Sequence, residues 1–135
     1  MLKKIGLSLA TLFIGTVAAH AQQTLSVSIN GVVTPCVPSD PCTVTTGNQI
    51  QINLFGLANS AVVVNRTHFL PGGGETTDTV DLGITASNGF YQFNGTYGCD
   101  QSVVGSWTEQ WTVGGVATNP ATLEIIVTTN PEVCG

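Results

Sequence analysis

The sequence predicts an all-β protein, an antiparallel two-sheet sandwich of about seven short strands. After residue 21 the chain contains 17 Thr and 15 Val against five Ala and six Leu. The β-branched side chains of Thr and Val pack well on a pleated sheet. Runs of these residues are separated by Gly, Pro, Asn and Asp, which favour turns, and no stretch shows the apolar spacing of an amphipathic helix. Short strands joined by turns are typical of a sandwich, and a closed barrel is the alternative.

Alternation of apolar and polar residues places the individual strands. The clearest case is Gln49–Leu57, in which three apolar residues share one face. Three prolines exclude residues 34–42 from a sheet interior. The weakest run, Thr76–Ile84, is expected at a sheet edge. The seven predicted strands are Thr24–Val33, Gln49–Leu57, Ala61–Leu70, Thr76–Ile84, Gly89–Tyr97, Val103–Val113 and Ala121–Thr129.

Residues 1–21 have the pattern of a signal peptide. Two lysines near the N-terminus precede the apolar run Ile5–Ala18, and Ala19–Ala21 matches the small-x-small cleavage pattern. The apolar run is shorter than the roughly 20 residues that a membrane anchor needs. We therefore expect cleavage and one domain, residues 22–135, that is secreted or periplasmic and does not insert into a membrane.

The charge balance of the predicted mature chain excludes some partners. Arg66 is its one basic residue other than histidine, against eight carboxylates, which is a net charge of −7. Nucleic-acid binding requires cationic side chains that neutralise several phosphates, so it is excluded. An anionic membrane surface would also repel the chain.

Four cysteines, Cys36, Cys42, Cys99 and Cys134, lie in the exported part. An even number in an oxidising compartment predicts two disulfides. A zinc site would need close cysteine pairs, usually with histidines, and His68 has no such spacing to any of them. Four cysteines allow three pairings, and spacing alone does not choose among them.

The chain resembles the immunoglobulin-like β-sandwich domains of exported bacterial proteins. The matching stretches are Val44–Ile52, Ala86–Tyr91 and Val104–Gly115. The Cys-Trp-Cys spacing of antibody domains is missing, so the resemblance does not imply antibody-like recognition. It implies a disulfide-stabilised domain for extracellular interaction, adhesion or structural support, with an unknown protein or glycan as partner.

The layout of such a sandwich favours one disulfide pairing. If the strands alternate in direction, the loops after strands one, three and five lie at the same pole as the chain end. All four cysteines then gather there. The favoured bridges are Cys36–Cys42 and Cys99–Cys134, and crossed pairings stay open.

Aromatic residues of the fifth and sixth strands give the candidate ligand site. Trp107, Glu109 and Trp111 share one face of the sixth strand, and Tyr91 lies on the fifth. If exposed, they form a platform for stacking sugar rings, with Glu109 accepting hydrogen bonds from hydroxyl groups. If buried, they are core residues, and Glu109 either pairs with Arg66 or lies where its strand leaves the sheet.

No pattern points to catalysis or to a cofactor. A nucleophilic triad would need a serine beside His68, and no Gly-x-Ser-x-Gly motif is present. We interpret Glu75, Asp78 and Asp81 as solvated charges at a strand edge rather than calcium ligands. The expected function is therefore non-enzymatic interaction, and the alternative is a small-ligand or carbohydrate-binding module that uses the aromatic residues.

Overall fold

The computed structural model describes residues 23–134, and nearly all of their regular structure is β. The predicted signal peptide, residues 1–21, lies outside the described residues. A 3-10 turn, η1 (Gln101–Val103), and a short helix, α2 (Pro131–Cys134), are the exceptions. The strands are β1 (Thr24–Ile29), β2 (Val32–Val33), β3 (Cys42–Thr45), β4 (Gln49–Phe55), β5 (Ala61–Phe69), β6 (Glu75–Ile84), β7 (Phe90–Thr96), β8 (Gly105–Val113) and β9 (Val116–Thr128).

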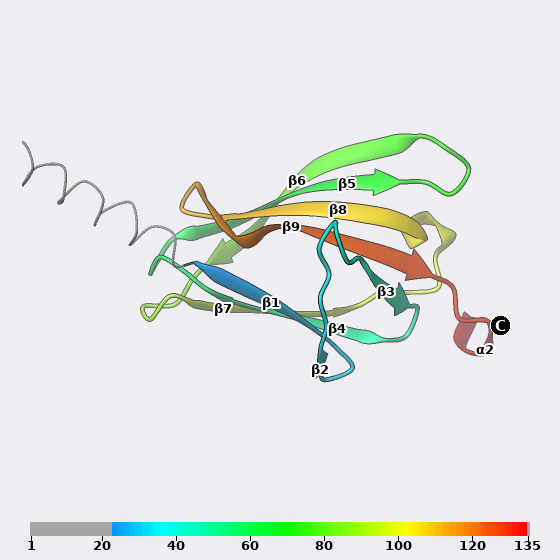
Figure 1. Ribbon diagram of the computed structural model, residues 1–135, viewed down its shortest axis with the longest axis horizontal. Helices are drawn as coiled ribbons and strands as arrows, with labels where there is room; N and C mark the ends of the chain where they lie inside the picture. The colour runs from blue at the N-terminus through cyan, green and yellow to red at the C-terminus, as the bar shows by residue number, and fades with distance from the viewer. Residues whose placement is uncertain (1–22, 135) are drawn as a thin grey trace, which may run out of the picture.

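The strands form one mixed sheet that curls into a half-barrel. Its order is β6-β5-β8-β9-β1-β4-β7, with β2 paired to β1 and β3 paired to β9. The curl brings β5, β6, β8 and β9 over β1, β4 and β7 (Figure 1). The prediction of a two-sheet antiparallel sandwich, the form that the immunoglobulin-like resemblance implied, is wrong. The strand β9 begins at Val116 rather than Ala121 and joins the two parts, and it pairs in parallel with both β1, at Thr24–Asn119, and β3.

Two further differences concern the N-terminal third. The predicted strand Thr24–Val33 breaks into a hairpin at Asn30 and Gly31, whose φ angles of 50° and 82° suit a two-residue turn. The segment Cys42–Thr45, which the alternation did not mark as a strand, pairs with β9 and buries Val44 completely.

The hydrophobic core fills the inside of the curl. Leu54, Leu123 and Ile125 are at most 1% exposed, and they come from strands on both sides of the interior. Full burial of such a side chain contributes about 1.5–3 kcal/mol. The alternation predicted for Gln49–Leu57 is confirmed, because every second residue of β4 is buried.

Both expected disulfides, Cys36–Cys42 and Cys99–Cys134, are confirmed. We expected all four cysteines at one pole of the molecule. Cys99 and Cys134 lie beyond the ends of the strands there, but the expectation is wrong for Cys36–Cys42. Cys42 lies beside Ile125, three residues before the end of β9, because β3 extends along that strand. The first bridge therefore lies beside Glu124 and Ile125 of β9, whereas Cys134 lies in α2 beyond the end of that strand.

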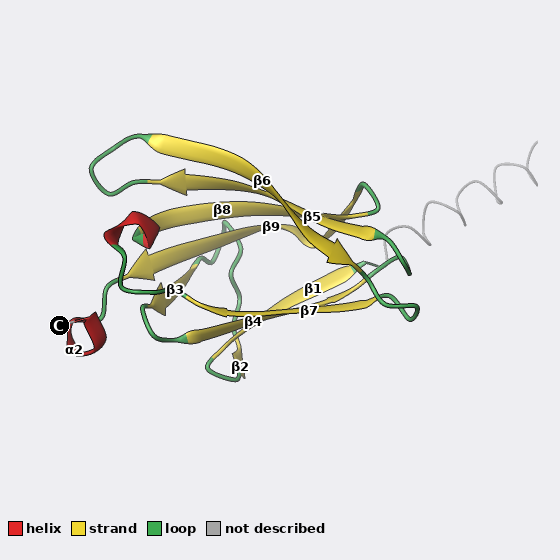
Figure 2. Ribbon diagram, turned by 180° about the vertical axis from the view of Figure 1, so that it is seen from behind, coloured by secondary structure: helices red, strands yellow, loops and turns green. Residues whose placement is uncertain are grey.

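The two terminal strands of the sheet order, β6 and β7, do not pair with each other. They approach where the Tyr91 hydroxyl donates a hydrogen bond to the Leu82 carbonyl oxygen (3.0 Å). From that point β6 diverges from β7 toward its own start (Figure 2). We call the unpaired gap between β6 and β7 the seam. The predicted edge position of Thr76–Ile84 is confirmed.

Candidate functional site

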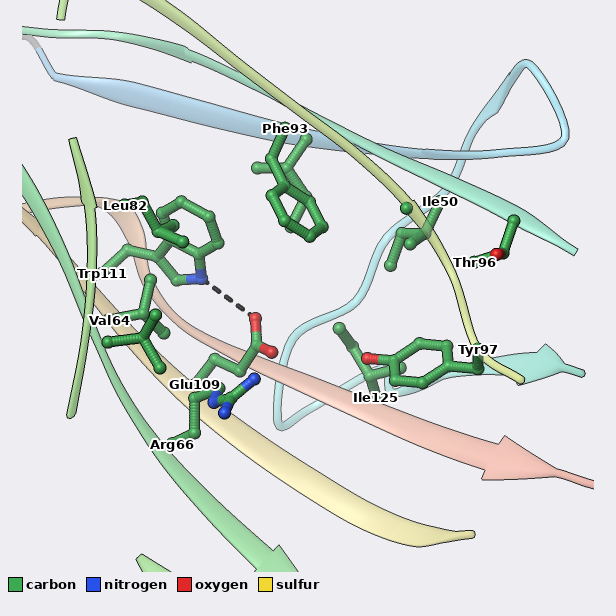
Figure 3. A pocket seen from close by; sticks show the side chains of 13 residues that line it. Ile50, Val64, Arg66, Leu82, Phe93, Thr96, Tyr97, Glu109, Trp111 and Ile125 are labelled. Carbon is green, nitrogen blue, oxygen red and sulfur yellow. Dashed lines mark hydrogen bonds between the residues drawn. The ribbon is translucent and has the colours of Figure 1, made fainter. Parts of the chain in front are cut away.

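A cavity of about 230 Å³ lies inside the curl at the seam. Apolar side chains form most of its wall, and strands from both sides of the interior contribute (Figure 3). Its aromatic residues are Phe93, Tyr97 and Trp111, and its polar side chains belong to Arg66, Thr96 and Glu109.

The local sequence explains why space remains at this place. Val80 and Leu82 project from β6, an edge strand that has no fully buried residue. On the opposite wall Gly95 has no side chain, and a Cβ there would approach the Phe93 ring to 3.1 Å. Gly95 therefore leaves room for the Phe93 ring beside the cavity.

The buried acid of the cavity is Glu109, which is 7% exposed. Its Oε1 accepts a hydrogen bond from Trp111 Nε1 at 3.1 Å, since the two residues lie on the same face of β8. Burial raises the pKa of Glu109, and the Trp111 hydrogen bond and the positive charge of Arg66 oppose that rise.

The second carboxyl oxygen, Oε2, faces open space. Within residues 23–134, every side-chain nitrogen or oxygen that is closed off from solvent has a hydrogen-bond partner. The hydrogen bond that Glu109 accepts there uses Oε1. Oε2 therefore belongs to the cavity surface, and Figure 3 shows it directed into the interior.

Arg66 pairs with Asp78 rather than with Glu109. In the sheet, Arg66 lies between these two acids on neighbouring strands. Its Nε and Nη2 donate to the two oxygens of Asp78 at 3.1 Å and 2.7 Å. This contact lowers the pKa of Asp78 and raises that of Arg66. The option that Glu109 pairs with Arg66 is thus not realised, because Asp78 accepts both hydrogen bonds of the Nε–Nη2 edge of the guanidinium group.

Tyr97, just after β7, projects its ring toward the interior (Figure 3). Burial raises the pKa of its hydroxyl, and the nearby charge of Glu109 raises it further. The hydroxyl thus stays neutral and is able both to donate and to accept a hydrogen bond.

The structure separates the four residues of the predicted ligand site. Glu109 and Trp111 line the cavity, and Trp111 is only 2% exposed. Trp107 instead stacks on His68, with ring centroids 4.0 Å apart, and its Nε1 donates to the carbonyl oxygen of Val103. A flat platform of both tryptophans is therefore absent from the outer surface of the described chain.

The Tyr91 hydroxyl bonds across the seam. Phe93 and Tyr97 were not among the four predicted site residues, although the period of two places them on the same face of the predicted fifth strand as Tyr91. Arg66 was predicted as one option for pairing with Glu109, and it lines the same cavity.

Other site types find no support among the residues that the structure describes. Between residues 23 and 134 no group of three or more His, Cys, Asp or Glu side chains could hold a metal ion. No helix in that range is long and apolar enough to cross a membrane. No protein-family model matches the chain, and no curated protein is similar to it. The site must therefore be interpreted from its own geometry.

Proposed function

We propose that the protein is an exported small-ligand-binding protein whose cavity at the seam takes a compact, mainly apolar molecule. The observation that carries this proposal is a preformed apolar cavity with a few convergent polar groups, the usual form of a ligand site. An engineered apolar cavity of about 150 Å³ binds benzene. A volume of about 230 Å³ therefore has room for one ring and a short substituent.

The cavity chemistry favours binding over catalysis. Glu109 is the one carboxylic acid in the wall, and no histidine, cysteine or serine stands beside it. The ring of His68 contacts the Val104 carbonyl oxygen at 2.8 Å and stacks on Trp107. The hydroxyl groups of the wall belong to Thr96 and Tyr97, and the hydrogen bond of the Glu109 carboxyl group runs to Trp111 instead. A nucleophile held by a base, which acyl transfer requires, is thus not part of the cavity wall. The two disulfides and the predicted signal peptide support export.

Interaction or adhesion, the role that the resemblance implied, has less support. The strand β6 is a long free edge, which would suit strand addition by a partner. It carries Glu75, Asp78 and Asp81, and charges on an edge disfavour such pairing. The cavity therefore supports ligand binding more strongly than the edge supports docking.

A cavity-filling variant tests the proposal. Val80→Trp places a large ring in the cavity, and Thr77→Trp places the same ring on the outer face of β6 as the matched control. A set of single-ring compounds is screened by thermal unfolding. A ligand at 100 times its Kd stabilises a protein by about 2.7 kcal/mol.

We expect at least one compound to raise the unfolding temperature of the wild type and of Thr77→Trp, but not of Val80→Trp. Equal stabilisation of all three proteins, or of none, would contradict ligand binding in this cavity.

A further inference from the structure

We propose that the ligand is an organic ammonium ion, a single ring or short chain whose charged nitrogen lies against Glu109 Oε2 among the rings of Phe93, Tyr97 and Trp111. This inference rests on the proposed function, and it names the chemical class that the cavity takes.

Glu109 is buried without an ion-pair partner among the described residues. The partner of its Oε1 is an indole N–H, which is neutral, and Oε2 remains available (Figure 3). A carboxylate removed from water is costly unless a charge and hydrogen bonds compensate it. An ammonium group supplies a positive charge and N–H donors together.

Arg66, the cation of the cavity wall, forms its ion pair with Asp78 rather than with Glu109. The guanidinium group of Arg66 forms its ion pair and two hydrogen bonds with Asp78, and its charge acts on Glu109 without an ion pair between them. Glu109 is thus the charged group of the cavity wall that has no ion-pair partner among residues 23–134, and the Tyr97 hydroxyl is neutral. An anionic ligand would meet the Glu109 carboxylate without gaining a free cation.

Three aromatic side chains form part of the cavity wall. Phe93, Tyr97 and Trp111 surround the space in front of Glu109, and they come from opposite sides of the interior (Figure 3). The negative face of an aromatic ring attracts a cation by about 0.5–2 kcal/mol, most strongly when water is excluded. An alcohol of the same shape gains none of this attraction.

The overall charge acts in the same direction. The predicted mature chain carries one arginine and eight carboxylates. A strongly acidic protein concentrates cations near its surface and repels anions. The negative charge of the protein should therefore raise the association rate of an ammonium ligand.

Three probes of one shape test the charge preference by titration calorimetry: 2-phenylethylamine, 2-phenylethanol and phenylacetate. The proteins are the wild type, Glu109→Gln and Glu124→Gln, the last removing an equal charge from β9 outside the cavity wall. A hydrogen bond to a charged group contributes about 1.5–3 kcal/mol, and about 1.4 kcal/mol is tenfold in affinity. We expect the amine to bind the wild type at least about tenfold more tightly than the alcohol.

The variants are expected to separate the contributions. Glu109→Gln should bring the amine to the affinity of the alcohol, whereas Glu124→Gln should change it by less than about twofold, as expected for a screened surface charge. Phe93→Leu, which keeps the wall apolar but removes a ring, should weaken the amine about fivefold and the alcohol less.

The results that would contradict the ammonium assignment are distinguishable from those that would contradict ligand binding in the cavity. If the alcohol or the carboxylate binds as tightly as the amine and Val80→Trp abolishes it, the ammonium assignment is overturned while ligand binding in the cavity stands. If none of the three probes binds, the ammonium assignment is overturned as well. The single-ring screen on Val80→Trp then decides the proposed function by itself.

Discussion

The middle of the sheet and its seam differ in how completely they are packed. In β9, Leu123, Ile125 and Val127 are at most 1% exposed, and Val113 of β8 is fully buried. In β6 no residue is fully buried. Most of the apolar stabilisation therefore lies on the closed side, where β8 and β9 pair. The seam contributes less to stability, and it is there that the structure leaves a cavity.

The contacts of β6 show the same contrast. Besides its backbone pairing with β5, the strand is held by polar contacts of side chains: the Arg66–Asp78 ion pair, the hydrogen bonds of Thr79 with Asn65 and of Thr77 with Thr67, and the one from Tyr91 to Leu82. Exposed ion pairs stabilise proteins by about 0–1 kcal/mol. The open side is thus positioned by weak polar contacts, and substitutions there should affect ligand binding before they affect folding.

Truncation of one apolar side chain on each side tests this contrast directly. Leu123→Ala should lower the free energy of unfolding by about 3–5 kcal/mol, because it leaves a void in a packed interior. Val80→Ala should lower it by less than about 1 kcal/mol, because the seam is already open. Urea denaturation measures both, and equal losses would contradict the division into a packed side and an open side.

Removal of the Cys99–Cys134 bridge tests how much this link between the seam and the packed side of the sheet contributes to stability. The bridge joins the chain after β7 to α2, which follows β9, across a sequence separation of 35 residues. A loop of that length predicts a loss of about 3–4 kcal/mol when both cysteines become serine. Because Tyr97 lies two residues before Cys99, the same variant should bind ligand more weakly.

Urea denaturation and titration with 2-phenylethylamine measure the two effects of the Cys99→Ser, Cys134→Ser variant. An unchanged affinity together with the loss of stability would show that the bridge does not position Tyr97.

Glu109, which is buried, and Asp78, which is exposed, should change the stability of the protein with pH in opposite directions. Burial raises the pKa of Glu109 in the folded state. Its contribution to stability is therefore fully present below the unfolded carboxyl pKa and is lost as pH rises through the folded value. Glu109→Gln should accordingly gain stability over the wild type as pH rises toward neutral.

Asp78 has the reverse sign, because Arg66 lowers its pKa in the folded state. Its contribution is present above the unfolded pKa and is lost as pH falls through the folded value. Asp78→Asn should thus be less stable than the wild type near neutral pH, with the difference closing in acid, and the effect should be small because the pair is exposed. Thermal unfolding between about pH 3 and pH 8 measures both variants, and the same trend in both would contradict the assignment of Glu109 to the interior.

Local patterns were sufficient to predict several features of the fold. The alternation in β4 and the edge position of β6 are confirmed. The disulfide pairing is confirmed too, although it was favoured by the layout of a sandwich that the structure does not have. The hairpin at Asn30 and Gly31 was readable from the Asn-Gly pair, which is a strong two-residue turn signal. Predicting one strand over Thr24–Val33 was therefore an avoidable error.

The curl and the cavity could not be read from local patterns. The join between β1 and β9 consists of one parallel strand pair, Thr24 with Asn119, and hydrogen bonds from the Gln23 side chain to β9, all between residues far apart in the sequence. The cavity depends on which side chains that curl brings together, and Glu109, Phe93 and Tyr97 come from separate segments. Periodicity assigns residues to a face of a strand, but it does not determine which faces meet.

The most direct test of a ligand site at the seam is a crystal structure of the oxidised protein with 2-phenylethylamine. The account predicts density for the ring between Phe93 and Trp111, with the nitrogen about 3 Å from Glu109 Oε2. An empty cavity at saturating amine, or a nitrogen that points away from Glu109, would contradict it.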